Sequence, residues 1–175
     1  CPIIDNGQAI IAPCGTDVLM MGVDCATGEV KWKIPNPNAW NMSHASVVPM
    51  TLLGKRMYVY AAAGGLAGVS AEPDTLGQLL WEQHVVGKVV APSAIPVGDD
   101  QIFTTVGYSR GSRLLKLSES GGKYSVEVVY DKPPTDVLAC EQQTPIFYNG
   151  LIYGIMPKDA GSLMGQFVCY KPDGT

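Results

Sequence analysis

A repeated segment constrains this chain more than any other feature of its sequence. Residues 23–32 (VDCATGEVKW) return, altered, at residues 69–81 (VSAEPDTLGQLLW). In both copies an apolar run leads into a turn with threonine and glycine, and a tryptophan follows that glycine by four residues. Self-similarity at a period in the forties is typical of propellers and other repeat arrays. The repeat therefore indicates an architecture before it indicates any chemistry.

The repeat extends along the whole chain. Four segments open alike at spacings of 44, 48 and 51 residues, counted from their second residues, Pro2, Ser46, Ala94 and Pro145. Each opening is followed by a turn signal and by a second run rich in β-branched and aromatic residues. A third run, a turn and a fourth run complete the first three units, whereas the fourth unit stops before its fourth run. Four antiparallel strands form the blade of a β-propeller, so the expected blades are 1–36, 45–86, 93–131 and 144–175, in one domain.

Composition agrees with an all-β protein and excludes several classes. With 46% hydrophobic and 16% charged residues, the chain is not of the disordered class. Its 20 glycines and 13 prolines favour strands and turns over helices. A net charge of −4 gives no electrostatic footprint for nucleic acid. No apolar run approaches the ~20 residues of a membrane helix, so no membrane span is predicted.

Five cysteines are present, without a CxxC pair. This odd set predicts neither a zinc site nor a complete disulfide framework. Cys25 and Cys169 lie inside apolar runs and are expected to be buried. A chain that starts at Cys1 is compatible with a lipid-bearing terminus, but residues 1–4 already stand in phase with the repeat. That phase favours the interpretation that the chain is cut here out of a longer sequence, rather than that it begins with a lipid-bearing cysteine.

These motifs resemble the PQQ-type (quinoprotein-like) propeller repeat, whose signature is an Ala-x-Asp-x-x-Thr-Gly-x-x-x-Trp-like run. Residues 23–32 match it well, residues 69–81 match with an insertion, and the last two units match mainly by phase. The resemblance implies an eight-bladed ring, of which this chain is half, with the last blade lacking its fourth strand. It also implies that a tryptophan from one blade docks against the next blade. Exported bacterial proteins carry such propellers, which implies a periplasmic or extracellular location, although unpaired cysteines argue mildly the other way.

A half ring leaves an apolar sheet face bare at each end. We therefore expect those faces to be covered by remaining blades, either from the same gene product or from another copy of this segment.

Loop residues at one mouth of the ring are the candidate binding residues. The loops from fourth to first strands and from second to third strands open at the same mouth, and loops on a rigid scaffold often carry binding sites. The candidates are Trp40, Asn41, His44, Arg110, Glu141, Gln142, Lys158 and Asp159. The other mouth carries hairpin and Thr-Gly turns, which are expected to be structural.

Each candidate also has a purely structural interpretation. Arg110 either clamps a carboxylate bidentately or forms an ion pair between blades. His44 is more often a solvated or locally bonded loop histidine than a ligand or base. Lys158 and Asp159 either bind or simply pair with neighbours. Trp40 either stacks on a ring-shaped ligand or covers the adjacent blade.

Two functions from different classes fit the sequence. The first is a non-catalytic propeller that binds a protein or small molecule, similar to the propeller lipoprotein of the outer-membrane assembly machinery. The alternative is part of a quinoprotein dehydrogenase that oxidises alcohols or sugars with PQQ and Ca²⁺. The alcohol-oxidising branch typically has adjacent cysteines, which are absent here. The sequence favours the binding function, with no cofactor and no catalytic residue expected.

Overall fold

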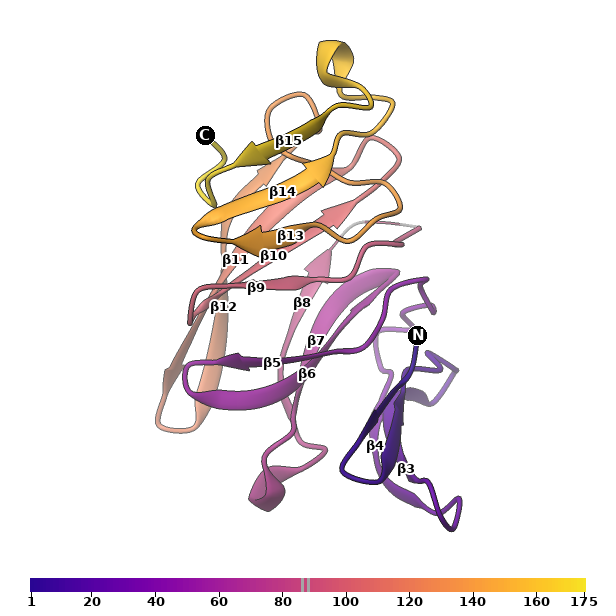
Figure 1. The fold of residues 1–175 in the computed structure, drawn as a ribbon. Coiled ribbons are helices and arrows are strands. Elements are labelled where there is room, and N and C mark those ends of the chain that lie inside the picture. Colours follow the sequence, from indigo (N-terminus) through magenta and orange to yellow (C-terminus); the bar gives the residue numbers. More distant parts are fainter. Residues whose placement is uncertain (86, 88) are drawn as a thin grey trace.

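The computed structural model describes residues 1–85, 87 and 89–175 (Figure 1). The described strands form four antiparallel sheets, and strand order follows the sequence in each. The sheets are blade 1 with β1 (Ile3–Asp5), β2 (Gln8–Ile11), β3 (Val18–Asp24) and β4 (Val30–Pro35); blade 2 with β5 (Val48–Leu52), β6 (Lys55–Ala62), β7 (Gly64–Ser70) and β8 (Leu79–Val85); blade 3 with β9 (Ile95–Val97), β10 (Gln101–Val106), β11 (Gly111–Ser120) and β12 (Lys123–Lys132); and blade 4 with β13 (Ile146–Tyr148), β14 (Leu151–Ile155) and β15 (Phe167–Tyr170). Two short 3₁₀ helices, η1 (Pro73–Thr75) and η2 (Gly161–Leu163), complete the described elements.

This architecture confirms the predicted all-β propeller blades and the three-stranded last blade. Val86, the expected end of blade 2, lies outside the described residues. Among the residues that are described, no helix has the length and apolar character needed to cross a membrane.

Hydrogen bonds tie the openings of the four units together. The amide of Val47 donates to the carbonyl of Cys1 at 3.0 Å. The amide of Ser46 donates to Ser93 Oγ, and the amide of Ser93 donates to Thr144 Oγ1, both at 2.9 Å. The openings of successive units thus lie side by side. Their contact explains why blades 1 and 4 stand at opposite ends of one continuous stack (Figure 1).

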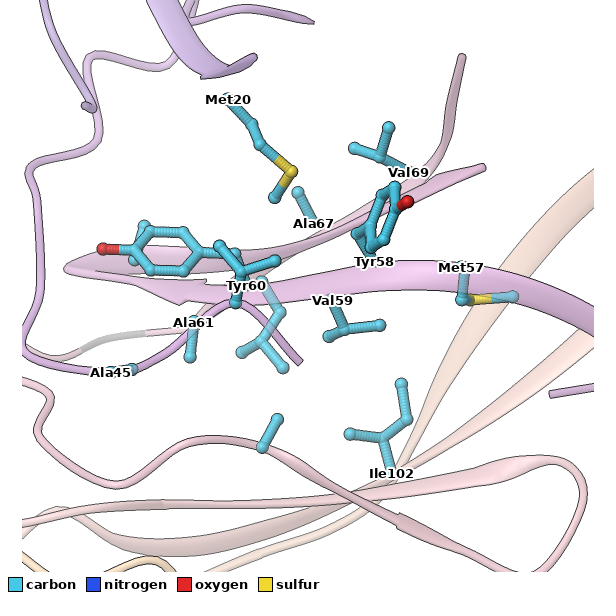
Figure 2. Close-up of a cluster of buried hydrophobic side chains, with 14 of the residues drawn as sticks. Met20, Ala45, Met57, Tyr58, Val59, Tyr60, Ala61, Ala67, Val69 and Ile102 are labelled. Atoms are coloured by element: carbon cyan, nitrogen blue, oxygen red, sulfur yellow. The ribbon is translucent and has the colours of Figure 1, made fainter. Parts of the chain in front are cut away.

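The main core lies on both faces of blade 2. Met20 of β3 approaches one face near Tyr58, and Ile102 of β10 approaches the other face near Val59 (Figure 2). All four side chains are at most 1% exposed. Because successive side chains of a strand point to opposite faces, β6 is apolar throughout its buried length. Blade 2 is therefore sandwiched between blades 1 and 3.

An aromatic side chain occupies the same register position in each four-stranded blade. Trp32 lies opposite Gly22, Trp81 opposite Gly68, and Tyr130 opposite Leu114. A register shift follows on the third strand in every case, between Gly22 and Val23, Gly68 and Val69, and Leu114 and Leu115. The aromatic pairing and the β-bulge next to it are therefore the structural features that the repeat shares from blade to blade.

The expected docking of tryptophan against the next blade is confirmed for Trp32. Its indole lies against Gly77 of blade 2 and stacks on Tyr58, with 6.2 Å between ring centroids. Its Nε1 donates to Gln8 Oε1 at 3.1 Å. The ring thus spans two blades while its single polar atom is satisfied.

The expectation that Cys25 and Cys169 are buried was wrong, because both are exposed. Cys25 lies in the turn that follows β3, and Cys169 points away from the packed face of blade 4. For Cys169, the apolar run shows that a strand is present but does not show which of its two faces meets a neighbour. For Cys25, the run does not show that the strand ends one residue earlier, at Asp24.

An ion pair joins blades 1 and 2 at their rim. Arg56 Nη1 lies 2.7 Å from Asp5 Oδ2, and the Tyr58 hydroxyl donates to the same oxygen. The hydrogen bond from Arg56 is the main reason that the pKa of Asp5 is lowered. A lowered carboxyl pKa contributes stability above the unfolded-state pKa, and this stability is lost as pH falls through the folded-state pKa.

We expect Asp5→Asn to lower the free energy of unfolding at pH 7 by about 1 kcal/mol, since solvent screens the partly exposed pair. The variant's stability should also depend less on pH below about pH 5 than that of the parent chain. Urea unfolding at a series of pH values measures both effects, with Asp17→Asn at an exposed residue as the control. Parallel stability curves for the parent chain and Asp5→Asn would contradict the role assigned to this pair.

Candidate binding surface at one mouth

Side chains from blades 3 and 4 meet at the mouth formed by the loops after second and fourth strands. Ser109 Oγ donates to Asp159 Oδ2 at 2.7 Å. Lys158 Nζ lies 3.8 Å from Glu141 Oε1 and 5.7 Å from the centroid of the Tyr108 ring. We call Tyr108, Ser109, Glu141, Lys158 and Asp159 the mouth cluster. It brings together three of the candidate residues predicted from the sequence, together with Ser109 from the loop predicted at this mouth and Tyr108, which the sequence did not point to.

Two shallow cavities flank the mouth cluster. One, of about 260 Å³, is lined by Glu141, Gln142 and Lys158 among others. The other, of about 170 Å³, is lined by Tyr108 and Arg110 together with Gly107 and Val89. Within the described part of the chain, Arg110 forms no ion pair. Because they line these two cavities, Arg110 and Gln142 extend the surface of the mouth cluster on either side.

The turn at residues 107–110 is strained. Tyr108 has φ 60° and Ser109 has φ 64°, in the left-handed region where a residue other than glycine costs about 1–2 kcal/mol. The flanking pair Val106 and Gly111 closes the β10–β11 hairpin and holds the turn in place. Asparagine and glycine are the usual residues at such turns. Strained positions of this kind cluster at functional sites, which makes this turn a candidate part of one.

Tyr108 is the most prominent residue that the strained turn presents. Its side chain is 50% exposed, although it is large and largely apolar. Lys158 covers part of the ring from blade 4 in a cation–π contact. The only sequence signal for this arrangement is the pair of glycines, Gly107 and Gly111, that brackets a turn without asparagine or glycine at its centre.

The remaining predicted residues lie apart from the mouth cluster. Trp40 is 4% exposed, rests on Gly64 and Gly65, and meets the ring of His84 edge-on at 5.4 Å. Its indole is therefore part of the core. Asn41 pairs through its backbone with Ala63. The exposed His44 donates its backbone amide to the carbonyl of Val90.

The described residues do not fit a Ca²⁺–PQQ site. No three of the described His, Cys, Asp and Glu side chains are grouped as a metal would require. The two carboxylates of the mouth cluster already have partners: Glu141 forms an ion pair with Lys158, and Asp159 accepts a hydrogen bond from Ser109. This surface instead combines charged groups of both signs with an exposed aromatic ring.

The fold and this surface together define a β-propeller segment with one polar, aromatic mouth. No protein-family model and no curated protein sequence matches the chain. Among solved structures, it is similar to BamB from Moraxella catarrhalis, with a TM-score of 0.60 and 13% sequence identity. The match covers 99% of this chain and 48% of that chain, so this chain spans about half the length of that protein. At such identity the likeness supports the propeller fold alone.

Proposed function

We propose that this chain is a non-catalytic propeller segment that binds a protein partner through the mouth cluster and Arg110. The observation that carries the proposal is the strained turn that holds Tyr108 half-exposed beside two cations, Lys158 and Arg110. Tyrosine and arginine dominate the binding energy of protein interfaces. The flanking cavities of about 170 and 260 Å³ are smaller than typical small-molecule pockets of ~300–1,000 Å³. Their size favours a protein over a small molecule.

The resemblance to the PQQ-type repeat also suggests what kind of larger protein contains this segment. We propose a PQQ-like repeat without a bound quinone, in a larger exported bacterial protein whose remaining blades cover the outer faces of blades 1 and 4. The apolar side chains Ile4 of blade 1 and Ile146 of blade 4, both more than half exposed, support a covering partner at each end.

Site-specific photo-crosslinking tests the mouth as a binding surface. A photoreactive phenylalanine analogue at residue 108 is expected to give a discrete protein adduct in a lysate of the organism that carries the gene. The same analogue at Lys123, the exposed first residue of β12, is the matched control. Arg110→Ala should lower the yield at residue 108 by about tenfold or more, as expected for a binding hot spot. Equal adducts from both positions, or none from residue 108, would refute the proposal.

Cofactor titration separates this function from the quinoprotein alternative. Adding PQQ and Ca²⁺ to the full-length product is expected to give no saturable binding and no dye-linked oxidation of alcohols. Tight cofactor binding with turnover would establish the dehydrogenase instead.

A further inference from the structure

Two departures from the repeat lie at the other mouth, among the turns between third and fourth strands. The turn between β7 and β8 of blade 2 holds the insertion, which forms η1. In blade 3 the strands are longer. Counted from the aromatic pairing, β11 continues over residues 114–120, whereas β3 and β7 continue only over residues 22–24 and 68–70. The long β11–β12 hairpin extends past the shared part of the blade, and β12 contacts β8 (Figure 1).

A groove of about 520 Å³ lies between these two departures. Glu72 and Asp74 line it from the inserted turn of blade 2, and Glu119 and Tyr124 line it from the long hairpin of blade 3. The groove has twice the volume of the larger mouth cavity and falls within the ~300–1,000 Å³ of typical small-molecule pockets. Since blades 2 and 3 are the inner blades of this chain, neither end blade contributes to the groove.

Apolar side chains line part of the groove. Leu53, Leu80 and Tyr124 are partly buried and pack against the main core, and each also borders the groove. The surface that the core leaves uncovered can contact the aliphatic part of a ligand. The groove therefore offers more than charge.

The carboxylates of the groove are held in place without being neutralised. Glu72 Oε1 accepts a hydrogen bond from the amide of Arg56 at 2.7 Å, and Glu119 Oε1 accepts one from an amide of its own hairpin. Among the described residues, neither carboxylate forms an ion pair, and nor does that of Asp74. Lys55 is the one cation among the described residues that line the groove. Negative charge is thus in excess.

Carboxylates from both blades lie near the hydroxyl of Tyr124. Glu119 is its cross-strand partner on β11. Burial raises the pKa of the Tyr124 hydroxyl, and the charges of Glu119 and Glu72 raise it further. Both carboxylates therefore act on one aromatic side chain, although they belong to different blades. An aromatic ring binds a cation over its face, and the carboxylates add attraction for the same charge.

We propose that this groove binds a linear aliphatic polyamine, with ammonium groups at the carboxylates of both blades and the methylene chain along Leu53 and Leu80. Hydrogen bonds between ammonium and carboxylate groups are about twice as strong as neutral ones. Carboxylates from two blades favour a ligand with at least two charges. They are not grouped as a metal ion would require. The groove lies at the other mouth from the mouth cluster and stands independently of the proposed function.

Isothermal titration calorimetry of the full-length product with spermidine measures this binding. We expect saturable binding, and we expect Glu72→Gln and Glu119→Gln each to weaken the affinity by about tenfold, because each removes a charge-assisted hydrogen bond. Glu127→Gln is the matched control, since it changes the net charge by the same amount at an exposed residue of β12 outside the groove. This control should leave the affinity unchanged.

Variants of the ring and of the ligand test the remaining parts of the proposal. Tyr124→Phe should retain the affinity because the ring remains, whereas Tyr124→Leu should lower it about fivefold. Butylamine, which carries a single ammonium group, should bind at least about tenfold more weakly than spermidine. The proposal is overturned if spermidine gives no saturable binding, or if Glu127→Gln loses as much affinity as Glu72→Gln. It is also overturned if Ca²⁺ displaces spermidine at equal concentration, because the groove is then a metal site.

Discussion

Replacing Trp81 with alanine is expected to lower the free energy of unfolding by about 3–5 kcal/mol. The indole is 4% exposed and lies directly on Gly68, so its removal leaves a cavity that the surrounding sheet cannot fill. Its Nε1 also donates to Met57 Sδ at 3.4 Å, and that contact is lost as well. Urea unfolding followed by circular dichroism measures the change.

Trp32→Ala is the matched comparison, because Trp32 occupies the same register position in blade 1. Trp32 is only partly buried, although it contacts Gly22 and Gly77. We expect its removal to cost less than removal of Trp81, because a smaller area is withdrawn from water. Equal losses for the two variants would mean that the position in the repeat, rather than burial, sets the cost.

Local chemistry made the blades predictable from sequence. Asn6-Gly7 and Asn149-Gly150 both adopt positive φ in the structure, as the turn signals required. The Thr-Gly turns and the tryptophan four residues later mark a bulged pairing that recurs in space as it does in sequence. These features depend on residues close in the chain, so a single sequence carries them.

The composition of the binding surface was less predictable, because it depends on contacts between distant residues. Glu141, Lys158 and Asp159 converge, whereas Trp40 folds into the core over Gly64 and Gly65. A residue in a loop at the mouth can either join a surface cluster or fold into the core, and its position in the sequence does not distinguish the two. The strain at Tyr108 was signalled only by the glycines that bracket its turn, since positive φ at this residue follows from the register of β10 and β11 rather than from its side chain.

The same limit explains the exposed Cys169. In β15, Phe167 and Cys169 alternate with Val168 and Tyr170, and all four belong to one apolar run. The sequence shows two apolar faces, but only the packing of blade 3 against one of them decides which residues are covered. Blade 4 thus combines a sequence suited to burial on both faces with a structure in which one face is open.

Gly68→Ala is expected to destabilise the chain by about 1–3 kcal/mol, since a methyl group there overlaps the Trp81 indole and forces an overpacked arrangement. Gly15→Ala is the control, because a Cβ at that residue meets no atom within 4 Å and its φ is not positive. We expect the control to lie within about 0.5 kcal/mol of the parent chain. Both values come from the same urea unfolding series.

The double variant Gly68→Ala/Trp81→Ala tests whether this overlap is the cause. If the indole is what the new methyl group meets, removing the indole leaves room for it, and the methyl group then fills part of the cavity. The double variant should therefore be no less stable than Trp81→Ala alone, with a coupling energy of about 1–3 kcal/mol between the two sites. Additive losses would place the cost of Gly68→Ala in the backbone of β7 instead. The bulged pairing would then depend on glycine for its conformation, and the tryptophan would be a consequence of that conformation rather than its reason.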